Sequence, residues 1–191
     1  MKHASRAKQI YSTDNDQEFL MKYKDDATAF DGLKKGIIQN KGIVNNRVSN
    51  LLFTLLEKEG IETHLIKQID ERHVLVKNLQ IIPVEVVTRN VVAGSLAKRV
   101  GKEEGYHLES PIIELYYKND ELHDPMINAY HVRALGWATD KQLYDMQTQT
   151  LKINDILTRF FDSIGIILVD FKLEFGIHEG RVILGDEISP D

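Results

Sequence analysis

Acidic and basic side chains alternate with apolar ones along a segment near the end of the chain. The segment 166–186 reads IILVDFKLEFGIHEGRVILGD, which predicts a β-hairpin whose turn lies at 176–180. Successive strand side chains point to opposite faces, so Asp170, Lys172 and Glu174 share one face of the first strand. The apolar residues between them take the other face. The pattern therefore predicts a strand with one packed face and one charged face.

Two carboxylates of this hairpin could bind a divalent cation. A short hairpin register would bring Asp186, after the second strand, close to Glu174. Mg²⁺ prefers one or two carboxylates and completes its octahedral shell with water and nucleotide phosphates. Lys172 would then neutralise a transferring phosphoryl group or a substrate carboxylate. A solvated ladder of exposed charges explains the same alternation about equally well.

A second segment could bind a phosphorylated substrate. Residues 82–95 read IPVEVVTRNVVAGS, a strand that carries Arg89 toward a loop of small residues. We expect Ser95 to be the N-cap of a following helix, whose amides and dipole attract anions. Arg89 could add a bidentate phosphate contact. The spacing alone favours a simpler interpretation, in which Arg89 pairs with a nearby acid and the helix is merely capped.

Two weaker groups of charges complete the set. Arg6 and Lys8 lie two positions apart on the first predicted strand and so share a face, as phosphate-binding residues of a nucleotide-covering hairpin would. Lys118 opens the segment 118–125, KNDELHDP, just after a strand. A solvated strand edge explains the first group, and an ordinary turn explains the second.

Two long helices must help to position these residues. Apolar residues recur at helical spacing over 44–59, and Gly60 supplies a left-handed end. The same spacing runs over 140–164, where Thr139 and Gln142 can form a capping box. The second of these is the longest helix that the sequence predicts.

The predicted strands are concentrated in the first half of the chain. They are 8–12, 18–23, 64–69, 73–77, 84–92, 112–117, 166–175 and 181–185. The order of strands and helices indicates the α+β class. The proline-bearing connection 78–83 is a candidate hinge between two lobes.

Composition excludes several classes of function. The chain has 191 residues, 42% hydrophobic and 28% charged, and a formal net charge of -5, which disfavours an electrostatic grip on nucleic acid. Cysteine is absent, so disulfides, thiolate metal sites and cysteine nucleophiles are excluded. The first residues carry no secretory signal, and the longest apolar stretch is too short to span a membrane. We expect a cytoplasmic protein that does not bind a membrane.

The motifs together resemble one enzyme family closely. LVDFKLEFG at 168–176 and IPVEVVTRNVVAGS at 82–95 match the two signature segments of the phosphoribosylaminoimidazole-succinocarboxamide synthase (SAICAR synthetase) family. KNDELHDP at 118–125 and LGDEISPD at 184–191 are also similar to family sequence. The resemblance covers nearly the whole chain.

This resemblance implies a fold and a reaction. Members have two lobes, distantly similar to protein kinases and ATP-grasp enzymes, which here implies a β-rich lobe over 1–80 and a larger α+β lobe over 81–191. They use ATP and Mg²⁺ to join L-aspartate to carboxyaminoimidazole ribotide, through an acyl phosphate, and release ADP and phosphate in purine biosynthesis. The resemblance also implies a homodimer.

The resemblance assigns roles to particular residues. It implies Mg²⁺ binding by Glu174 and Asp186, and contacts from Asp170 and Lys172 to the imidazole and the reacting carboxylate. The remaining roles are ATP phosphate binding by Arg6, Lys8 and Lys118, adenine binding along Lys77, Leu79 and Ile81, and ribotide phosphate binding by Arg89 and Ser95.

The two ends of the chain depart from the family pattern. Members usually read Gly-Lys-x-Lys near the N-terminus, where this sequence has Ser5 and Arg6. Members also continue beyond the position of Asp191 through an arginine-bearing segment into a C-terminal helix. A polypeptide without that segment is expected to bind ATP and to turn over poorly.

Two other functions fit parts of the pattern. A phosphotransferase of kinase-like architecture would also use Lys8, Glu174 and Asp186, and it would form a phosphate ester instead of an amide. A non-catalytic nucleotide-binding or assembly protein would bind nucleotide without turnover.

Overall fold

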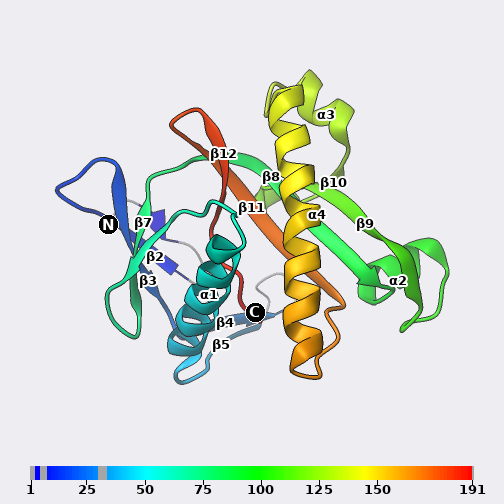
Figure 1. Cartoon of the computed structure of the whole chain (residues 1–191), viewed down its shortest axis with the longest axis horizontal. Helices are drawn as coiled ribbons and strands as arrows, with labels where there is room; N and C mark the ends of the chain where they lie inside the picture. The colour runs from blue at the N-terminus through cyan, green and yellow to red at the C-terminus, as the bar shows by residue number, and fades with distance from the viewer. Residues whose placement is uncertain (1–2, 5–7, 30–33, 191) are drawn as a thin grey trace. The chain divides into compact units, whose positions relative to one another are not determined.

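A computed structural model describes residues 3–4, 8–29 and 34–190 of the chain (Figure 1). The chain divides into two compact units, one formed by Met1–Ile81 with Gly176–Asp191 and the other by Ile82–Phe175. The expected division assigned the whole of 81–191 to one lobe, so it differs from the structure at the C-terminal segment. Arg6 lies outside the described residues.

Backbone pairing explains why the C-terminal segment belongs to the first unit. The His64 amide donates to the carbonyl of Leu184 at 2.8 Å, and the Leu184 amide donates to the carbonyl of Glu62 at 3.1 Å. Further along, the Ile188 amide donates to the hydroxyl of Ser49 at 3.3 Å. These bonds join residues more than a hundred positions apart, which local sequence patterns cannot predict.

The first unit is built on a five-stranded sheet in the order β1-β2-β3-β7-β6. Helix α1 packs against β3 and β6. The sheet's core is a cluster of Met21, Tyr23, Val74 and Val76. The elements are β1 (His3–Ala4), β2 (Lys8–Ser12), β3 (Glu18–Tyr23), β4 (Asp26–Ala29), β5 (Lys34–Ile37), α1 (Lys41–Lys58), β6 (Leu65–Gln68), β7 (His73–Lys77) and β12 (Arg181–Gly185).

The described strands of the second unit belong to a sheet in the order β10-β9-β8-β11-β12, whose member β12 is assigned to the first unit. Its elements are β8 (Gln80–Val91), α2 (Gly94–Val100), β9 (His107–Tyr117), η1 (Asp120–Leu122), β10 (Met126–Ile127), α3 (Ala129–Ala134), α4 (Asp140–Ser163) and β11 (Asp170–His178), and β8 and β11 extend into the first unit. These elements confirm the predicted α+β class.

Helix α4 lies across one face of β8 and β11 (Figure 1). Asn90 of β8 and Asn154 of α4 exchange two side-chain hydrogen bonds, at 2.8 and 3.0 Å. Asn90 shares its strand face with Val84 and Val86, which are fully buried. The opposite faces of β8 and β11 are therefore the ones that carry the charged side chains.

Both predicted helices are confirmed, and α4 has the predicted capping box. Thr139 accepts a hydrogen bond from the Gln142 amide, and the Gln142 side chain accepts one from the Thr139 amide. The predicted strand 166–175 begins too early, because β11 starts at Asp170. Ile166 and Ile167 are exposed there. β-branched residues favour a strand, but they do not supply the neighbouring strand with which it must pair.

The hairpin turn is tighter than predicted. Glu179 and Gly180 have φ of 50° and 77°, as a two-residue turn of the right twist requires. Gly176 lies inside β11, where an added Cβ would come within 2.7 Å of the Leu79 Cβ. That glycine permits a close backbone approach and does not form the turn.

Acid should weaken the first unit through Asp25. Arg72 donates to Asp25 at 2.7 and 2.9 Å, and the Gly42 amide in α1 donates at 2.9 Å, so the pKa of Asp25 lies well below its usual range. The unfolded chain takes up a proton here as the pH falls below about 4, whereas the folded chain does not. We therefore expect Asp25→Asn to be less stable than the parent at pH 7 and to lose less further stability on acidification.

Urea unfolding at neutral pH and near pH 3 checks this expectation. Asp14→Asn, at an exposed position whose carboxylate makes no such bonds in the described structure, is the matched control. An acid sensitivity of Asp25→Asn equal to that of the parent would contradict the role given to this carboxylate.

Candidate active site

One face of the second unit's sheet carries a row of charged side chains, which we call the charged face. The β8–β9 register pairs Glu85 with Tyr116 and Val87 with Glu114, so their side chains share a face with Arg89. Strand β11 adds its own alternating charges to this face. Its members are Glu85, Arg89, Glu114, Tyr116, Asp170, Lys172 and Glu174.

Arg89 contacts two carboxylates of the charged face and the hydroxyl of Ser95 in α2. Its Nε donates to Glu114 at 3.1 Å and its Nη1 donates to Asp170 at 2.6 Å. Its Nη2 lies 3.3 Å from the Ser95 hydroxyl. Burial by itself lowers the pKa of Arg89, but hydrogen bonds to Asp170 and its neighbours outweigh burial and raise it. The structure thus brings Arg89, Ser95 and Asp170 together, with the guanidinium charged.

Lys172 and Lys118 flank Glu174. Lys172 donates to Glu85 at 2.6 Å and lies 3.6 Å from Glu174, and Lys118 donates to Glu174 at 2.9 Å. Glu174 and Glu85 are only 4% and 7% exposed. A buried carboxylate held by ammonium groups is no solvated ladder, so that alternative is wrong for Glu174.

The expected cap of α2 is wrong. The N-cap is Ala93, no side chain caps the helix, and Ser95 is the second helical residue. The Gly94 amide instead donates to Glu104 at 2.9 Å. The exposed Ser95 hydroxyl therefore points to Arg89 and is not used as a cap.

The segment 118–125 forms the turn that its composition predicts. Asn119 accepts hydrogen bonds from the amides of Glu121 and Leu122, which fixes a 3₁₀ turn. The turn places Lys118 beside Glu174. This geometry fits both an ordinary turn and a turn that positions Lys118 for phosphate binding.

Lys8 is buried among acids in the first unit. Lys8 is only 6% exposed. Its ammonium group forms ion pairs with Asp186 at 2.5 Å and with Glu187 at 3.1 Å. Burial by itself lowers the pKa of Lys8, but the two carboxylates outweigh it and raise the pKa. Burial also lowers the pKa of the neighbouring His64 to about 4, so this imidazole is neutral at pH 7.

The residues expected along the adenine differ in exposure. The Lys77 side chain is half-buried, and its ammonium group donates to the carbonyl of Thr63 at 2.9 Å. Leu79 lies against Gly176, and Ile81 is 43% exposed. Ile81 therefore presents apolar surface that a base could cover.

The predicted metal pair spans the two units. Glu174 belongs to the second unit and Asp186 to the first, so their joint binding of one cation stays a prediction. Within the described part of the chain, no cluster of three or more acidic, histidine or cysteine side chains is arranged to hold a metal. One or two carboxylates completed by nucleotide phosphates would be the alternative that suits Mg²⁺.

Several charged residues near the predicted ones were missed. Glu85 and Glu114 are buried acids within apolar strands, and Glu187 directly follows Asp186. Glu85 could have been found from the period of two that it shares with Arg89. Glu114 could not, because its place beside Arg89 depends on the β8–β9 register.

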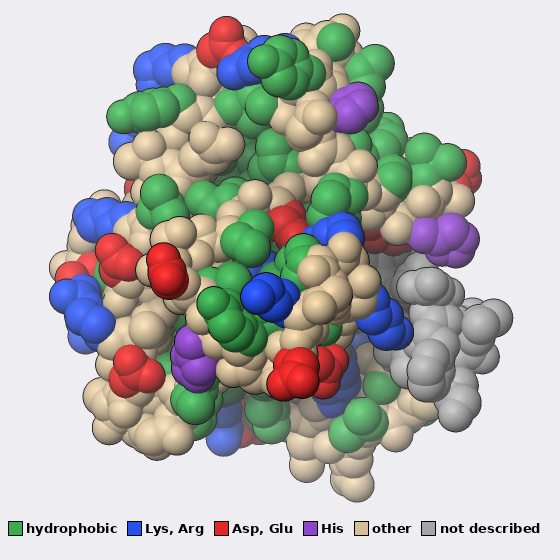
Figure 2. Space-filling view, turned by 90° about the vertical axis from the view of Figure 1, so that its right-hand side faces the viewer, with side chains coloured by type: hydrophobic (Ala, Val, Ile, Leu, Met, Phe, Trp, Pro, Cys, Tyr) green, Lys and Arg blue, Asp and Glu red, His purple; other side chains and the backbone are tan. Residues whose placement is uncertain are grey.

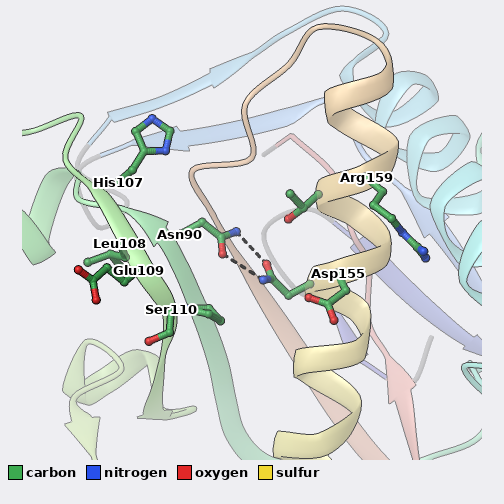
Figure 3. Close-up of a pocket in the computed structure, with 10 residues that line it drawn as sticks. Asn90, His107, Leu108, Glu109, Ser110, Asp155 and Arg159 are labelled. Carbon is green, nitrogen blue, oxygen red and sulfur yellow. Dashed lines mark hydrogen bonds between the residues drawn. The ribbon is translucent and has the colours of Figure 1, made fainter.

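A cavity of about 510 Å³ opens between the start of β9 and α4 (Figure 3). The Asn90–Asn154 pair lies in its wall, and none of the predicted site residues lines it. The face drawn in Figure 2 mixes acidic and basic side chains without a broad basic area. No helix of the described residues is long and apolar enough to cross a membrane.

Comparison with known proteins decides the family. The family model described as SAICAR synthetase matches residues 2–191. The chain belongs to the SAICAR synthetase family. A phosphoribosylaminoimidazole-succinocarboxamide synthase of Desulfitobacterium hafniense strain Y51 is 56% identical over 191 residues, which are all of this chain and 80% of that protein. One of Caldanaerobacter subterraneus is 52% identical over 99% of this chain and 80% of its own length.

Solved structures agree with this SAICAR synthetase assignment. The synthase of Ehrlichia chaffeensis has a TM-score of 0.97 and 46% identity, over 100% of this chain and 82% of that one. The SAICAR synthetase of Pyrococcus horikoshii OT3 has a TM-score of 0.93 and 50% identity, over 97% and 81%. A SAICAR synthetase solved in complex with ADP has a TM-score of 0.96 and 49% identity, over 99% and 81%. These matches confirm the predicted fold and enzyme class, an ATP-dependent ligase of purine biosynthesis.

Proposed function

We propose that this chain joins L-aspartate to the carboxylate of carboxyaminoimidazole ribotide, with conversion of ATP to ADP and phosphate. The family match over residues 2–191 is the observation that carries the proposal. The ADP complex of a relative that is 49% identical supports ATP as the co-substrate. The charged face carries cations that could bind phosphate and carboxylate groups, and carboxylates that could bind Mg²⁺.

ATP makes the amide bond possible. A carboxylate is a poor acyl donor because its oxide is a bad leaving group, whereas an acyl phosphate releases phosphate readily. The carboxylate oxygen takes the γ-phosphoryl group, the aspartate amine then attacks the carbon, and phosphate leaves as the amine loses a proton. Positioning and charge neutralisation are the protein's contribution.

Arg89 and Ser95 would hold the ribotide phosphate. Their side chains lie together, and Arg89 is charged and half-buried. A guanidinium beside a hydroxyl is suited to a phosphate oxyanion. Lys172, close to the buried Glu85 and Glu174, would hold the reacting carboxylate, and Asp170 would contact the imidazole.

The nucleotide would be held by basic and apolar side chains. Lys8, Arg6 and Lys118 would contact its phosphates, and the adenine would lie along Lys77, Leu79 and Ile81. Glu174 fits a Mg²⁺ ligand, because it is a buried carboxylate whose negative charge requires a cationic partner. Asp186 would be the second ligand. A Mg²⁺ ion held there would supply positive charge that offsets the charge of the nucleotide phosphates.

We also propose a cellular location and an assembly state. We place the enzyme in the cytoplasm, since purine biosynthesis needs no oxidising compartment and the chain has no cysteine. We also propose a homodimer, on the family resemblance alone.

The assay that tests the proposal omits one component at a time. Incubated with ATP, Mg²⁺, L-aspartate and the carboxylated ribotide, the chain should release ADP only when all four are present. Mass spectrometry should find the succinocarboxamide product. ADP release that is indifferent to aspartate, with a phosphate ester as product, would instead support the phosphotransferase.

A further inference from the structure

Glu114 is a buried carboxylate at the centre of a charged network in the second unit. Its side chain is 7% exposed. It accepts hydrogen bonds from the Arg89 Nε at 3.1 Å and from the Tyr116 hydroxyl at 2.9 Å. Arg99 of α2 also donates to it. One carboxylate therefore joins two guanidinium groups and a phenol.

The contacts of Arg89 separate an anchoring carboxylate from an exchangeable one. Glu114 binds the Nε edge, whereas Asp170 and Ser95 contact the terminal nitrogens Nη1 and Nη2. Each terminal nitrogen carries a second N–H, and this pair is the fork that binds an oxyanion bidentately. The Asp170 side chain is 35% exposed, so an incoming anion can replace it more easily than it can replace Glu114.

The same carboxylate permits two cations to lie near one ligand. Two guanidinium groups repel each other, and the repulsion is strong where water is excluded. The negative charge of Glu114 between Arg89 and Arg99 offsets this repulsion. Without it, Arg99 and the Nε edge of Arg89 would lose their shared acceptor, and the orientation of Arg89 would depend on its remaining contacts.

We infer that Glu114 is a positioning residue for the binding of the ribotide's 5′-phosphate. It holds the Nε edge of Arg89 so that the terminal nitrogens face the phosphate, and it keeps Arg99 beside Arg89. Glu114 itself does not touch the phosphate. This inference rests on the proposed function, which places that phosphate at Arg89 and Ser95.

The test uses Glu114→Gln, which removes the charge with almost no change of shape. We expect the KM for the ribotide to rise about 10-fold, as loss of a charged hydrogen-bond partner would produce. The kcat and the KM values for ATP and aspartate should change less than about twofold. The decisive comparison is the riboside that lacks the 5′-phosphate, whose kcat/KM should be the same in the variant and the parent.

Glu109→Gln is the matched control, since Glu109 is an exposed acid of the same strand. A ribotide-to-riboside preference that is unchanged by Glu114→Gln would overturn the inference, as would an equal loss with both substrates. If that variant does not fold, Tyr116→Phe removes one hydrogen bond from the same carboxylate and should lower the preference about threefold. An unchanged preference in Tyr116→Phe would overturn the inference equally.

The activity of the parent chain distinguishes failure of the proposed function from failure of the positioning role of Glu114. If the parent chain forms no amide from the ribotide and aspartate, the proposed function fails whatever Glu114 does. If the parent is active and its preference for the phosphorylated substrate survives the loss of the Glu114 charge, only the positioning role fails.

Discussion

Replacing Glu174 with glutamine is expected to lower kcat/KM by about 100-fold or more. Glutamine keeps the shape of the side chain but carries no charge to bind a cation. Its neighbours Lys118 and Lys172 would also lose the carboxylate that balances them. We therefore expect weaker binding of Mg²⁺-ATP together with slower turnover, measured by ADP release at varied Mg²⁺ and ATP concentrations.

The control for this change is Glu179→Gln in the turn of the same hairpin. Its side chain is 72% exposed, so the same chemical substitution should leave activity unchanged. Near-normal turnover and Mg²⁺ dependence in Glu174→Gln would show that the charged face does not bind the metal-nucleotide complex.

Replacing Lys8 with methionine is expected to destabilise the folded chain by about 3–5 kcal/mol. Methionine fills a similar volume but leaves Asp186 and Glu187 without the ammonium group that both contact. Two neighbouring carboxylates in a partly buried site then repel each other. Urea unfolding at pH 7 measures the loss.

A second substitution separates lost charge balance from lost packing. Adding Asp186→Asn to Lys8→Met removes one of the two repelling charges, so it should recover part of the lost stability. Lys67→Met, at an exposed lysine of the same sheet, should change stability little. Equal stability of Lys8→Met and the parent would mean that the acids around Lys8 need no cation.

Local patterns predicted the elements that carry the site. Alternation in LVDFKLEFG separated Asp170, Lys172 and Glu174 from the apolar residues, and the structure buries Leu173 and Phe175 at 1% and 0% exposure. Helical spacing and the capping box predicted α4 to within one residue. These features depend on neighbours in the chain, and so they can be recognised without tertiary structure.

Predictions failed where contacts with other segments of the chain decide the outcome. Serine is a common N-cap residue, yet the helix begins at Gly94 and the Ser95 hydroxyl faces Arg89. Residues 166–169, the first four of the predicted strand 166–175, do not form a strand. Composition alone predicts neither result, because Glu104 binds the Gly94 amide at the start of the helix and the carbonyl of Val169 accepts hydrogen bonds from the amides of Asn90 and Val91.

The amino-acid sequence by itself determined the family, the α+β class and the alternation that puts acids and lysines on one strand face. Only the tertiary structure decided that Glu174 is buried between two lysines and that Glu114 joins Arg89 to Arg99. Strand periodicity is a local property of the backbone, whereas burial and ion pairing depend on which strands become neighbours and in which register.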